Sequence, residues 1–297
     1  VLSPGTLKNY YTTEKYVKKF LKDKYKCNDI FLSSINYQFI TEFEFYLRTC
    51  KPLEINNPLT NNGIMKHMER LRKMVTMSYK MEWIIKDPFS NYKLKFKKKE
   101  MSFLNEEELY KIEHTAFSNK FLERVRDLFI FSCYTGLSYI DLANLTTKNI
   151  TIGIDGEYWI KTSRQKTEVQ VNIPLLPKAF QLIQKYRQDP RVLGGENILP
   201  LLSNQKINSN LKEIARLCGL DKSLTFHCAR HTFATTITLT NGVPLETVSK
   251  MLGHTKLTTT QIYVHVIKHK ISEDMKKLKE KLNEKSDMHE IVTSYIS

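Results

Sequence analysis

The sequence predicts a mainly α-helical protein of two domains, with a small antiparallel β-sheet in the second domain. Three observations support this fold class. Apolar residues recur at helical spacing along most of the chain, three short runs between residues 149 and 173 alternate like strands, and a Lys-rich stretch at 93–99 divides the chain. A length of 297 residues also suits two domains.

The first domain is predicted to be helical over residues 1–98. Apolar periodicity places helices at about 6–22, 36–47 and 61–83. Residues 1–100 carry 20 Lys and Arg against 10 acidic residues, which is most of the formal net charge of +15. Such an excess of positive charge indicates a nucleic-acid partner.

The third of these helices gathers positive charge on one side. Its basic residues include Lys66, Arg70, Lys73 and Lys80, and spacings of three, four and seven place them on one helical face. We expect this face to follow a nucleic-acid backbone. The alternative is a basic helix that is merely solvated, and a shallow dependence of binding on salt would favour it.

A linker is predicted at about residues 88–102, after Asp87. Ser102 then opens a stretch with the pattern of a capping box, so the second domain is taken to span 99–270. Its first part is predicted to contain helices at about 105–116 and 121–135, then the three strands, and the chain then returns to helix.

The end of this domain contains the candidate catalytic residues. His227 and Arg230 are three apart in a run with helical periodicity, so both side chains can face one anion. A guanidinium binds two phosphate oxygens in parallel, and an imidazole can donate to an oxygen or move a proton. A His-x-x-Arg pair by itself is usually an ordinary surface or core feature. The neighbouring motifs therefore decide whether this pair is functional.

That context is a series of predicted turns and helix starts. Gly242 is expected to end one helix and Pro244 to lie in the first turn of the next. This short helix ends before His254, which is left on a turn. The threonines at 258–260 are N-cap candidates for a further helix carrying Tyr263, whose phenol is a candidate nucleophile.

The order of these motifs resembles the tyrosine recombinase (integrase) family. The pattern HxxRH begins at His227, LGH ends at His254, and TTxxY ends at Tyr263. Upstream, the resemblance extends to TGLSYIDL at 135–142 and RQKT at 164–167 and covers roughly residues 103–266. Several ordered motifs are far more specific than one. The two upstream segments further resemble integrases of bacterial conjugative transposons.

The resemblance implies a two-domain clamp on double-stranded DNA and a 3′-phosphotyrosine intermediate. Tyr263 matches the nucleophile, Arg230 the second catalytic Arg, and His227 the histidine three residues before it. His254 matches a position held by His or Trp, and Lys166 the lysine that protonates the leaving 5′ oxygen. Because the covalent intermediate conserves the phosphodiester energy, neither ATP nor another cofactor is expected.

One position departs from the family pattern. In the family, TGL is followed by the first catalytic Arg, whereas this chain has Ser138, which cannot supply the charge or donor geometry of a guanidinium. We hypothesise that Arg164 replaces it, because Arg164 and Lys166 alternate as on a strand and would face one side. The alternative is that Arg164 contacts flanking DNA. Asp141 and His231 are expected to support their neighbours without reacting.

Two other functions stay open at this point. A type IB topoisomerase uses similar chemistry, and relaxation of supercoils without site preference would indicate it. A catalytically weakened DNA-binding protein of the same fold is suggested by Ser138. A metal site is not expected, because His254, His265 and His269 lack a Cys pair or a carboxylate at ligand spacing.

The remaining expectations concern partners and location. The resemblance implies attachment-site DNA, a homotetramer on that DNA, and accessory DNA-bending proteins as further candidates. Residues 271–297 are predicted to form a helical tail that docks on a neighbouring protomer, with folding back on its own domain as the alternative. Five cysteines without metal-type spacing and no membrane-spanning stretch indicate a bacterial cytoplasmic protein.

Overall fold

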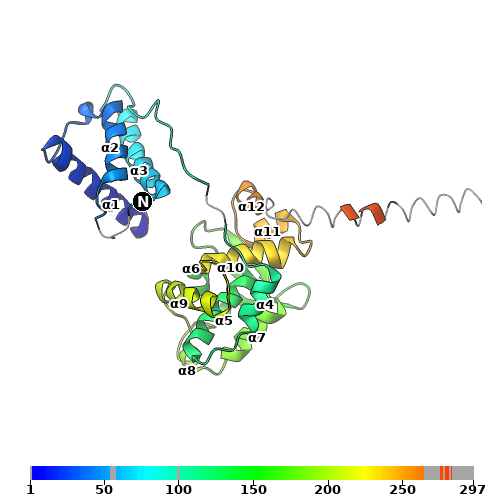
Figure 1. Ribbon diagram of the computed structural model, residues 1–297. Coiled ribbons are helices and arrows are strands. Elements are labelled where there is room, and N and C mark those ends of the chain that lie inside the picture. Colours follow the sequence, from blue (N-terminus) through cyan, green and yellow to red (C-terminus); the bar gives the residue numbers. More distant parts are fainter. Residues whose placement is uncertain are drawn as a thin grey trace, which may run out of the picture. The chain divides into compact units, whose positions relative to one another are not determined.

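The computed structural model divides into two compact units, Val1–Glu100 and Met101–Ser297 (Figure 1). Each unit is described by itself. The structure describes residues 2–53, 58–98, 101–263, 275, 276, 278–280 and 282. Most of the predicted tail, and both His265 and His269, therefore lie outside the described residues.

The first unit is helical, as predicted. Its main helices are α1 (Pro4–Phe20), α2 (Tyr37–Thr49) and α3 (Asn61–Lys80), with a π-helical turn at Leu21–Tyr25 and a 3-10 turn at Leu32–Ser34. Each main helix starts where a side chain accepts a backbone N–H, and these N-caps are Ser3, Asn36 and Thr60. The three predicted helices are confirmed, although α3 ends at Lys80 and not at residue 83.

The second unit begins with α4 (Glu106–His114), α5 (Lys120–Thr135) and α6 (Tyr139–Ala143). After the sheet follow α7 (Pro177–Tyr186), α8 (Pro190–Leu193), α9 (Asn204–Leu217), α10 (Phe226–Thr232), a π-helical segment (Phe233–Leu239), α11 (Leu245–Met251) and α12 (Thr258–Gln261). The capping box that opens the unit is formed by Asn105 and Glu108.

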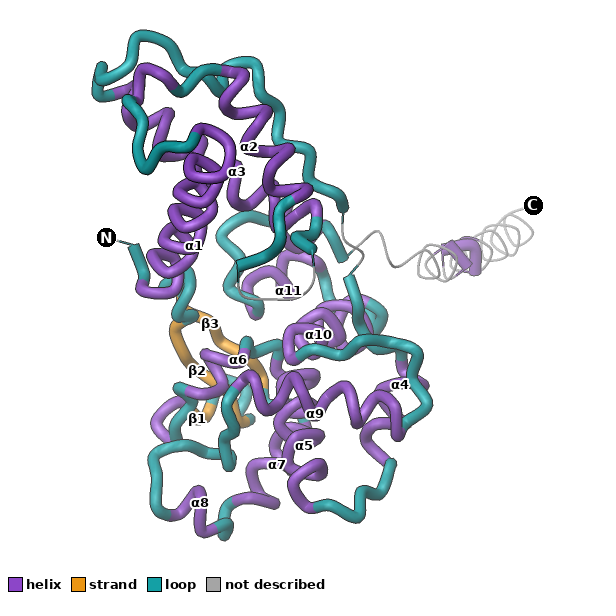
Figure 2. Tube along the Cα trace, turned by 60° about the vertical axis from the view of Figure 1, so that its left-hand side comes forward, coloured by secondary structure: helices purple, strands orange, loops and turns teal. Residues whose placement is uncertain are grey.

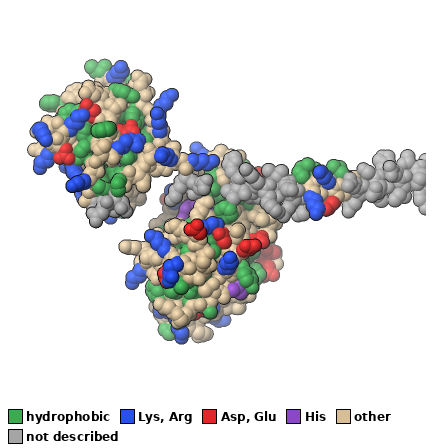
Figure 3. Space-filling model, viewed as in Figure 1, with side chains coloured by type: hydrophobic (Ala, Val, Ile, Leu, Met, Phe, Trp, Pro, Cys, Tyr) green, Lys and Arg blue, Asp and Glu red, His purple; other side chains and the backbone are tan. Residues whose placement is uncertain are grey.

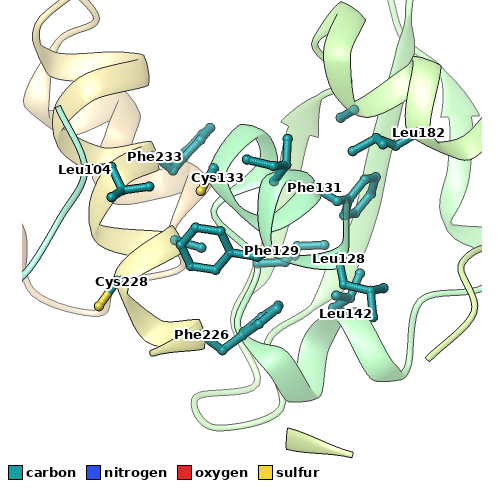
Figure 4. Close-up of a cluster of buried hydrophobic side chains, with 14 of the residues drawn as sticks. Leu104, Leu128, Phe129, Phe131, Cys133, Leu142, Leu182, Phe226, Cys228 and Phe233 are labelled. Carbon is teal, nitrogen blue, oxygen red and sulfur yellow. The ribbon is translucent and has the colours of Figure 1, made fainter. Parts of the chain in front are cut away.

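Helix α5 is the centre of the second core. Nearly every residue from Val125 to Cys133 is buried, which is typical of a helix surrounded by other elements. Figure 4 shows Phe129 and Phe131 of α5 with Phe226 and Phe233, which belong to α10 and to the π-helical segment after it. Packing of α10 on α5 fixes the position of the helix that carries His227 and Arg230.

The sheet is a three-stranded antiparallel meander, β1 (Ile150–Ile152), β2 (Tyr158–Ser163) and β3 (Gln170–Pro174), as the sequence predicts. Figure 2 shows the strands together at one edge of the unit. Ile160 pairs with Ile150 and Ile173, so apolar side chains line one face. The prediction that Arg164 and Lys166 alternate on a strand is wrong, because both lie in the β2–β3 loop, residues 164–169.

Candidate active site

Arg230 is the buried centre of the candidate site, with 3% of its surface exposed. Its Nη1 donates to the Gly136 carbonyl at 2.7 Å, and its Nη2 donates to the Leu252 carbonyl. These carbonyls lie at the C-terminal ends of α5 and α11, where helix carbonyls have no intrahelical partner and the helix dipole favours a cation. Gly136 has a φ of 69°, and a Cβ there would meet the Phe233 ring at 2.5 Å.

Arg164, in the β2–β3 loop, also contacts the Leu252 carbonyl. Its Nη1 lies 3.4 Å from the Leu252 oxygen and 3.5 Å from the Gly253 oxygen. Burial, and next the Arg164 cation, lower the pKa of Arg230 to about 10. The structure thus brings the guanidinium of Arg164 beside that of Arg230, at the Leu252 carbonyl.

The two guanidiniums have backbone carbonyls as acceptors and form no salt bridge with a carboxylate within the part of the chain that is described. In addition, Nε of Arg164 is buried without a hydrogen-bond partner among these residues. Neighbouring cations in a partly buried site are unfavourable unless a negative charge offsets them. The geometry therefore favours an anionic ligand such as a phosphodiester.

Tyr263 lies beside these cations and is 2% exposed. Its hydroxyl and Nδ1 of His231 are joined by a hydrogen bond of 3.1 Å. The ring of His254 is nearly parallel to the Tyr263 ring at a centroid distance of 6.5 Å, and the His227 ring is 4.4 Å from that of His231. The structure thus brings the phenol and all three predicted imidazoles into one cluster.

Burial, more than the charge of the neighbouring groups, shifts the pKa values of this cluster. Burial, reinforced by neighbouring cations and imidazoles, lowers the pKa of His231 and of His254 to about 4. The pKa of His227 is also lowered, by burial and then by Arg230. Burial raises the pKa of Tyr263, and the Arg230 and Arg164 cations oppose that increase. At neutral pH the imidazoles are neutral and the phenol is protonated.

Lys166 is exposed in the β2–β3 loop and has no hydrogen bond in the described structure. It is close enough to His227 to contribute to the lowering of that residue's pKa. Ser138 is the N-cap of α6 and donates to Oδ2 of Asp141 at 2.6 Å. The other Asp141 oxygen accepts the N–H of Gln165 at 3.0 Å.

Three local predictions for residues 244–263 are wrong. The threonines 258–260 are not N-caps, because α12 starts after Leu257, and Thr260 instead bonds Nδ1 of His254 at 2.8 Å through its hydroxyl. Tyr263 follows this short helix and is not part of it. Pro244 is likewise the N-cap of α11, one position before the predicted first turn.

The predicted basic face lies on α3 in the first unit. Lys and Arg side chains are spread over the face of that unit shown in Figure 3. Lys66 pairs with Glu69 at 2.7 Å, and Arg70 donates to Thr13 at 3.4 Å. Lys73 and Lys80 are exposed. The structure therefore leaves the charges of Lys73 and Lys80 more available than those of Lys66 and Arg70.

Sequence reasoning missed the backbone groups of the site. The carbonyls of Gly136, Leu252 and Gly253 hold the guanidiniums, and the N–H of Gln165 is held by Asp141. The glycines in TGL and LGH were the available signal, since glycine permits a left-handed backbone and close approach. Over the described residues no group of three or more His, Cys, Asp or Glu could hold a metal ion, and no helix there is long and apolar enough to cross a membrane.

The chain is similar to curated tyrosine recombinases over most of its length. A tyrosine recombinase XerC of Halalkalibacterium halodurans is 24% identical over 285 residues, covering 91% of this chain and 89% of the relative. A XerC of Pediococcus pentosaceus is 26% identical over 231 residues, covering 74% and 76%.

Solved structures share the fold. A lambda integrase dimer bound to a COC′ core site matches with a TM-score of 0.69 and 19% identity, covering 88% of this chain and 89% of that one. The Tn1549 transposon integrase in complex with a circular intermediate DNA matches with a TM-score of 0.65 and 18% identity, covering 89% and 91%. The predicted fold class, mainly α with a small antiparallel sheet, is confirmed.

Fold and site thus define a tyrosine recombinase, the class that the motifs indicated. Family models match nearly the whole described chain: "Phage integrase SAM-like domain" over residues 1–96 and "Phage integrase family" over residues 102–270. The chain therefore belongs to the phage integrase family.

Proposed function

We propose that this protein is a site-specific integrase of a bacterial mobile element, which cleaves and rejoins double-stranded DNA through a 3′-phosphotyrosine at Tyr263. The observation that carries the proposal is the position of the Tyr263 hydroxyl, in the same site as the paired guanidiniums of Arg230 and Arg164. A phosphodiester bound by these cations lies next to a nucleophile from the same chain.

The cleavage step uses these groups as follows. The Tyr263 oxygen attacks phosphorus, the bond from phosphorus to the 5′ oxygen breaks, and a 3′-phosphotyrosine and a free 5′ hydroxyl result. Arg230 and Arg164 stabilise the charge that develops on the non-bridging oxygens. Arg164 in this role replaces the guanidinium that Ser138 cannot provide.

Proton transfer is assigned to the remaining residues. A neutral imidazole accepts the phenolic proton, with His231 already bonded to that hydroxyl and His227 adjacent. Lys166 donates a proton to the leaving 5′ oxygen, and His254 contacts the phosphate beside Tyr263. Religation uses the same groups in reverse, so no cofactor is needed.

The assembly follows from exchange between two duplexes. Four strands are cut and rejoined, which suits a homotetramer on DNA, with Lys73, Lys80, Arg70 and Lys66 of α3 on the DNA backbone. Two structural relatives are DNA-bound: a lambda integrase tetramer bound to a Holliday junction and the Tn1549 transposon integrase in complex with a circular intermediate DNA. The tail 271–297 would dock in trans, accessory DNA-bending proteins are further candidates, and the site of action is the bacterial cytoplasm.

Covalent trapping tests the proposal. The protein is incubated in EDTA with nicked, labelled duplexes carrying candidate attachment sites, and we expect an SDS-stable adduct that Tyr263→Phe abolishes. Tyr110→Phe is the matched control, because Tyr110 also has a histidine ring against it, that of His114, but lies exposed on α4. An adduct that persists in Tyr263→Phe, or tight binding of the same DNA with no adduct, would contradict the proposal. Relaxation of supercoils without site preference would indicate a topoisomerase.

A further inference from the structure

The β2–β3 loop, residues 164–169, is held from two sides. On one side the buried carboxylate of Asp141, 4% exposed, accepts the N–H of Gln165 at 3.0 Å. On the other side the Thr167 hydroxyl donates to the Gly253 carbonyl at 3.3 Å. These two anchors flank Lys166, which makes no hydrogen bond of its own in the described structure. The position of Lys166 is therefore set by its neighbours.

The Asp141 carboxylate is itself oriented by Ser138. The Ser138 hydroxyl donates to Oδ2 at 2.6 Å, which leaves Oδ1 for the Gln165 N–H. Asp141 forms no salt bridge among the residues that the structure describes, so a hydroxyl and a backbone N–H are its partners. Buried carboxylates need such partners, because an unsatisfied one is strongly unfavourable.

We propose that Ser138 and Asp141 are positioning residues that hold Lys166 where it can protonate the leaving 5′ oxygen. This inference rests on the proposed cleavage reaction. It also assigns Ser138 a positioning role, in addition to the fact that Ser138 lacks the guanidinium of the family's first Arg. Arg164 differs from Lys166 in this respect, because the Leu252 and Gly253 carbonyls hold its side chain independently of Asp141.

The distinction leads to a test with two altered substrates. A 5′-bridging sulfur leaves readily without a proton, so it makes a general acid unnecessary. A neutral methylphosphonate at the cleaved position removes a charge that guanidiniums offset. The probe is a nicked duplex, selected from a random library by binding to the full chain, made in the ordinary, the sulfur and the methylphosphonate form.

We expect Asp141→Ala to slow single-turnover cleavage of the ordinary phosphate roughly 10- to 100-fold, within the range for general acid catalysis. The sulfur substrate should restore most of this loss, as it should for Lys166→Ala, whereas the methylphosphonate should not. Ser138→Ala should show a smaller loss with the same pattern. Restoration by one substrate atom also demonstrates that the variant is folded and binds DNA.

Two matched variants complete the design. Asp141→Asn can accept the Gln165 N–H and donate to Ser138, so it should recover most of the loss seen in Asp141→Ala. Asp155→Ala removes an acid that accepts a backbone N–H, that of Glu157, in the other hairpin of the same sheet, and should cleave normally.

Three results obtained with the Asp141 variants would overturn the inference. They are normal cleavage by Asp141→Ala, restoration of Lys166→Ala but not Asp141→Ala by sulfur, and equal losses in Asp141→Asn and Asp141→Ala. Failure of sulfur to restore Lys166→Ala would remove the general acid role and the inference with it. The Tyr263→Phe adduct experiment does not involve the leaving group and judges the proposed function separately.

Discussion

Backbone carbonyl groups hold the guanidiniums of Arg230 and Arg164 side by side. The Leu252 carbonyl is an acceptor for both guanidiniums, although the two residues come from α10 and from the β2–β3 loop. The carbonyl oxygen carries only a partial negative charge, so it positions the cations without neutralising them. Their positive charge stays available to a phosphate.

Arg164→Ala tests the replacement of the family's first Arg. Loss of one charged donor from such a site lowers the cleavage rate by about 100- to 1,000-fold, and a gel shift should show DNA binding nearly unchanged. Ser138→Arg in the Arg164→Ala background should recover part of the rate, because it returns a guanidinium to the position used by the family. Arg216→Ala on α9, where Arg216 pairs with Glu213, is the control. Wild-type cleavage by Arg164→Ala would show that Arg164 only contacts flanking DNA.

Gly253 is required both for its left-handed backbone conformation and for the lack of space for a Cβ. Its φ is 62°, and a Cβ would meet Val171 at 2.8 Å and Cδ of Arg164 at 3.3 Å. Gly242 has a φ of 85° and nothing within 4 Å of a Cβ. Both Gly→Ala variants should lose about 1 to 2 kcal/mol in urea unfolding, but only Gly253→Ala should also slow cleavage. Equal cleavage by the two variants would contradict the close approach.

At the scale of elements, the helix that carries the site is continuous with a π-helical segment. Thr232 accepts the Leu104 N–H at 2.9 Å, and Thr236 donates to the Leu104 carbonyl. The segment that opens the second unit is therefore hydrogen-bonded to α10 and to the π-helical segment that follows it. Periodicity predicted a helix here but not its π geometry, because π-helical turns are rare within helices.

Helix α3 allows a prediction about DNA binding. Each exposed lysine that neutralises a phosphate contributes about one unit to the slope of log affinity against log salt. Lys73→Ala and Lys80→Ala should therefore reduce this slope by about one each, measured by fluorescence anisotropy on duplex DNA. Lys66→Ala should have a smaller effect, because Glu69 already pairs with Lys66. Lys18→Ala on α1, paired with Glu14, is the control. Unchanged slopes for Lys73 and Lys80 would favour the solvated helix.

At the scale of the whole molecule, each unit has its own core and one of the chain's two tryptophans, Trp83 in the first and Trp159 in the second. The stability of each unit can therefore be followed separately in the full chain. A Trp159→Phe variant keeps Trp83 of the first unit as its single tryptophan.

The first unit should lose stability in mild acid. His67 is 6% exposed and hydrogen-bonded to Thr13 at 2.9 Å, and burial, followed by Arg70, lowers its pKa to about 4. Because the unfolded histidine binds its proton near pH 6.5, stability is complete above that pH and falls toward pH 4. Urea unfolding of the Trp159→Phe variant should show a loss of about 2 kcal/mol between pH 7 and pH 5.

The control for this loss is His67→Asn in the same background. This variant should be less stable at pH 7. Its free energy of unfolding should change much less between pH 7 and pH 5, since asparagine does not titrate. Equal pH dependence in both proteins would show that other groups, and not His67, govern acid stability.

The sequence by itself determined the helices, the sheet, the family and the order of His227, Arg230 and Tyr263. Helical periodicity, caps and strand alternation are local properties, so they can be read along the chain. Two local predictions fail: Thr260 lies inside α12 and does not cap it, and Arg164 lies in a loop and not on a strand.

The tertiary structure alone decided which groups meet. Arg230 bonds Gly136, which is 94 residues away, and Asp141 holds the loop of Lys166 across 24 residues. Such contacts depend on how α10, α11 and the sheet pack around α5, and that packing is set by shape complementarity in the core. A linear pattern records the kind of residue at each position but not the distance between positions, which is why His231, Asp141 and Ser138 acquired their partners only in the folded protein.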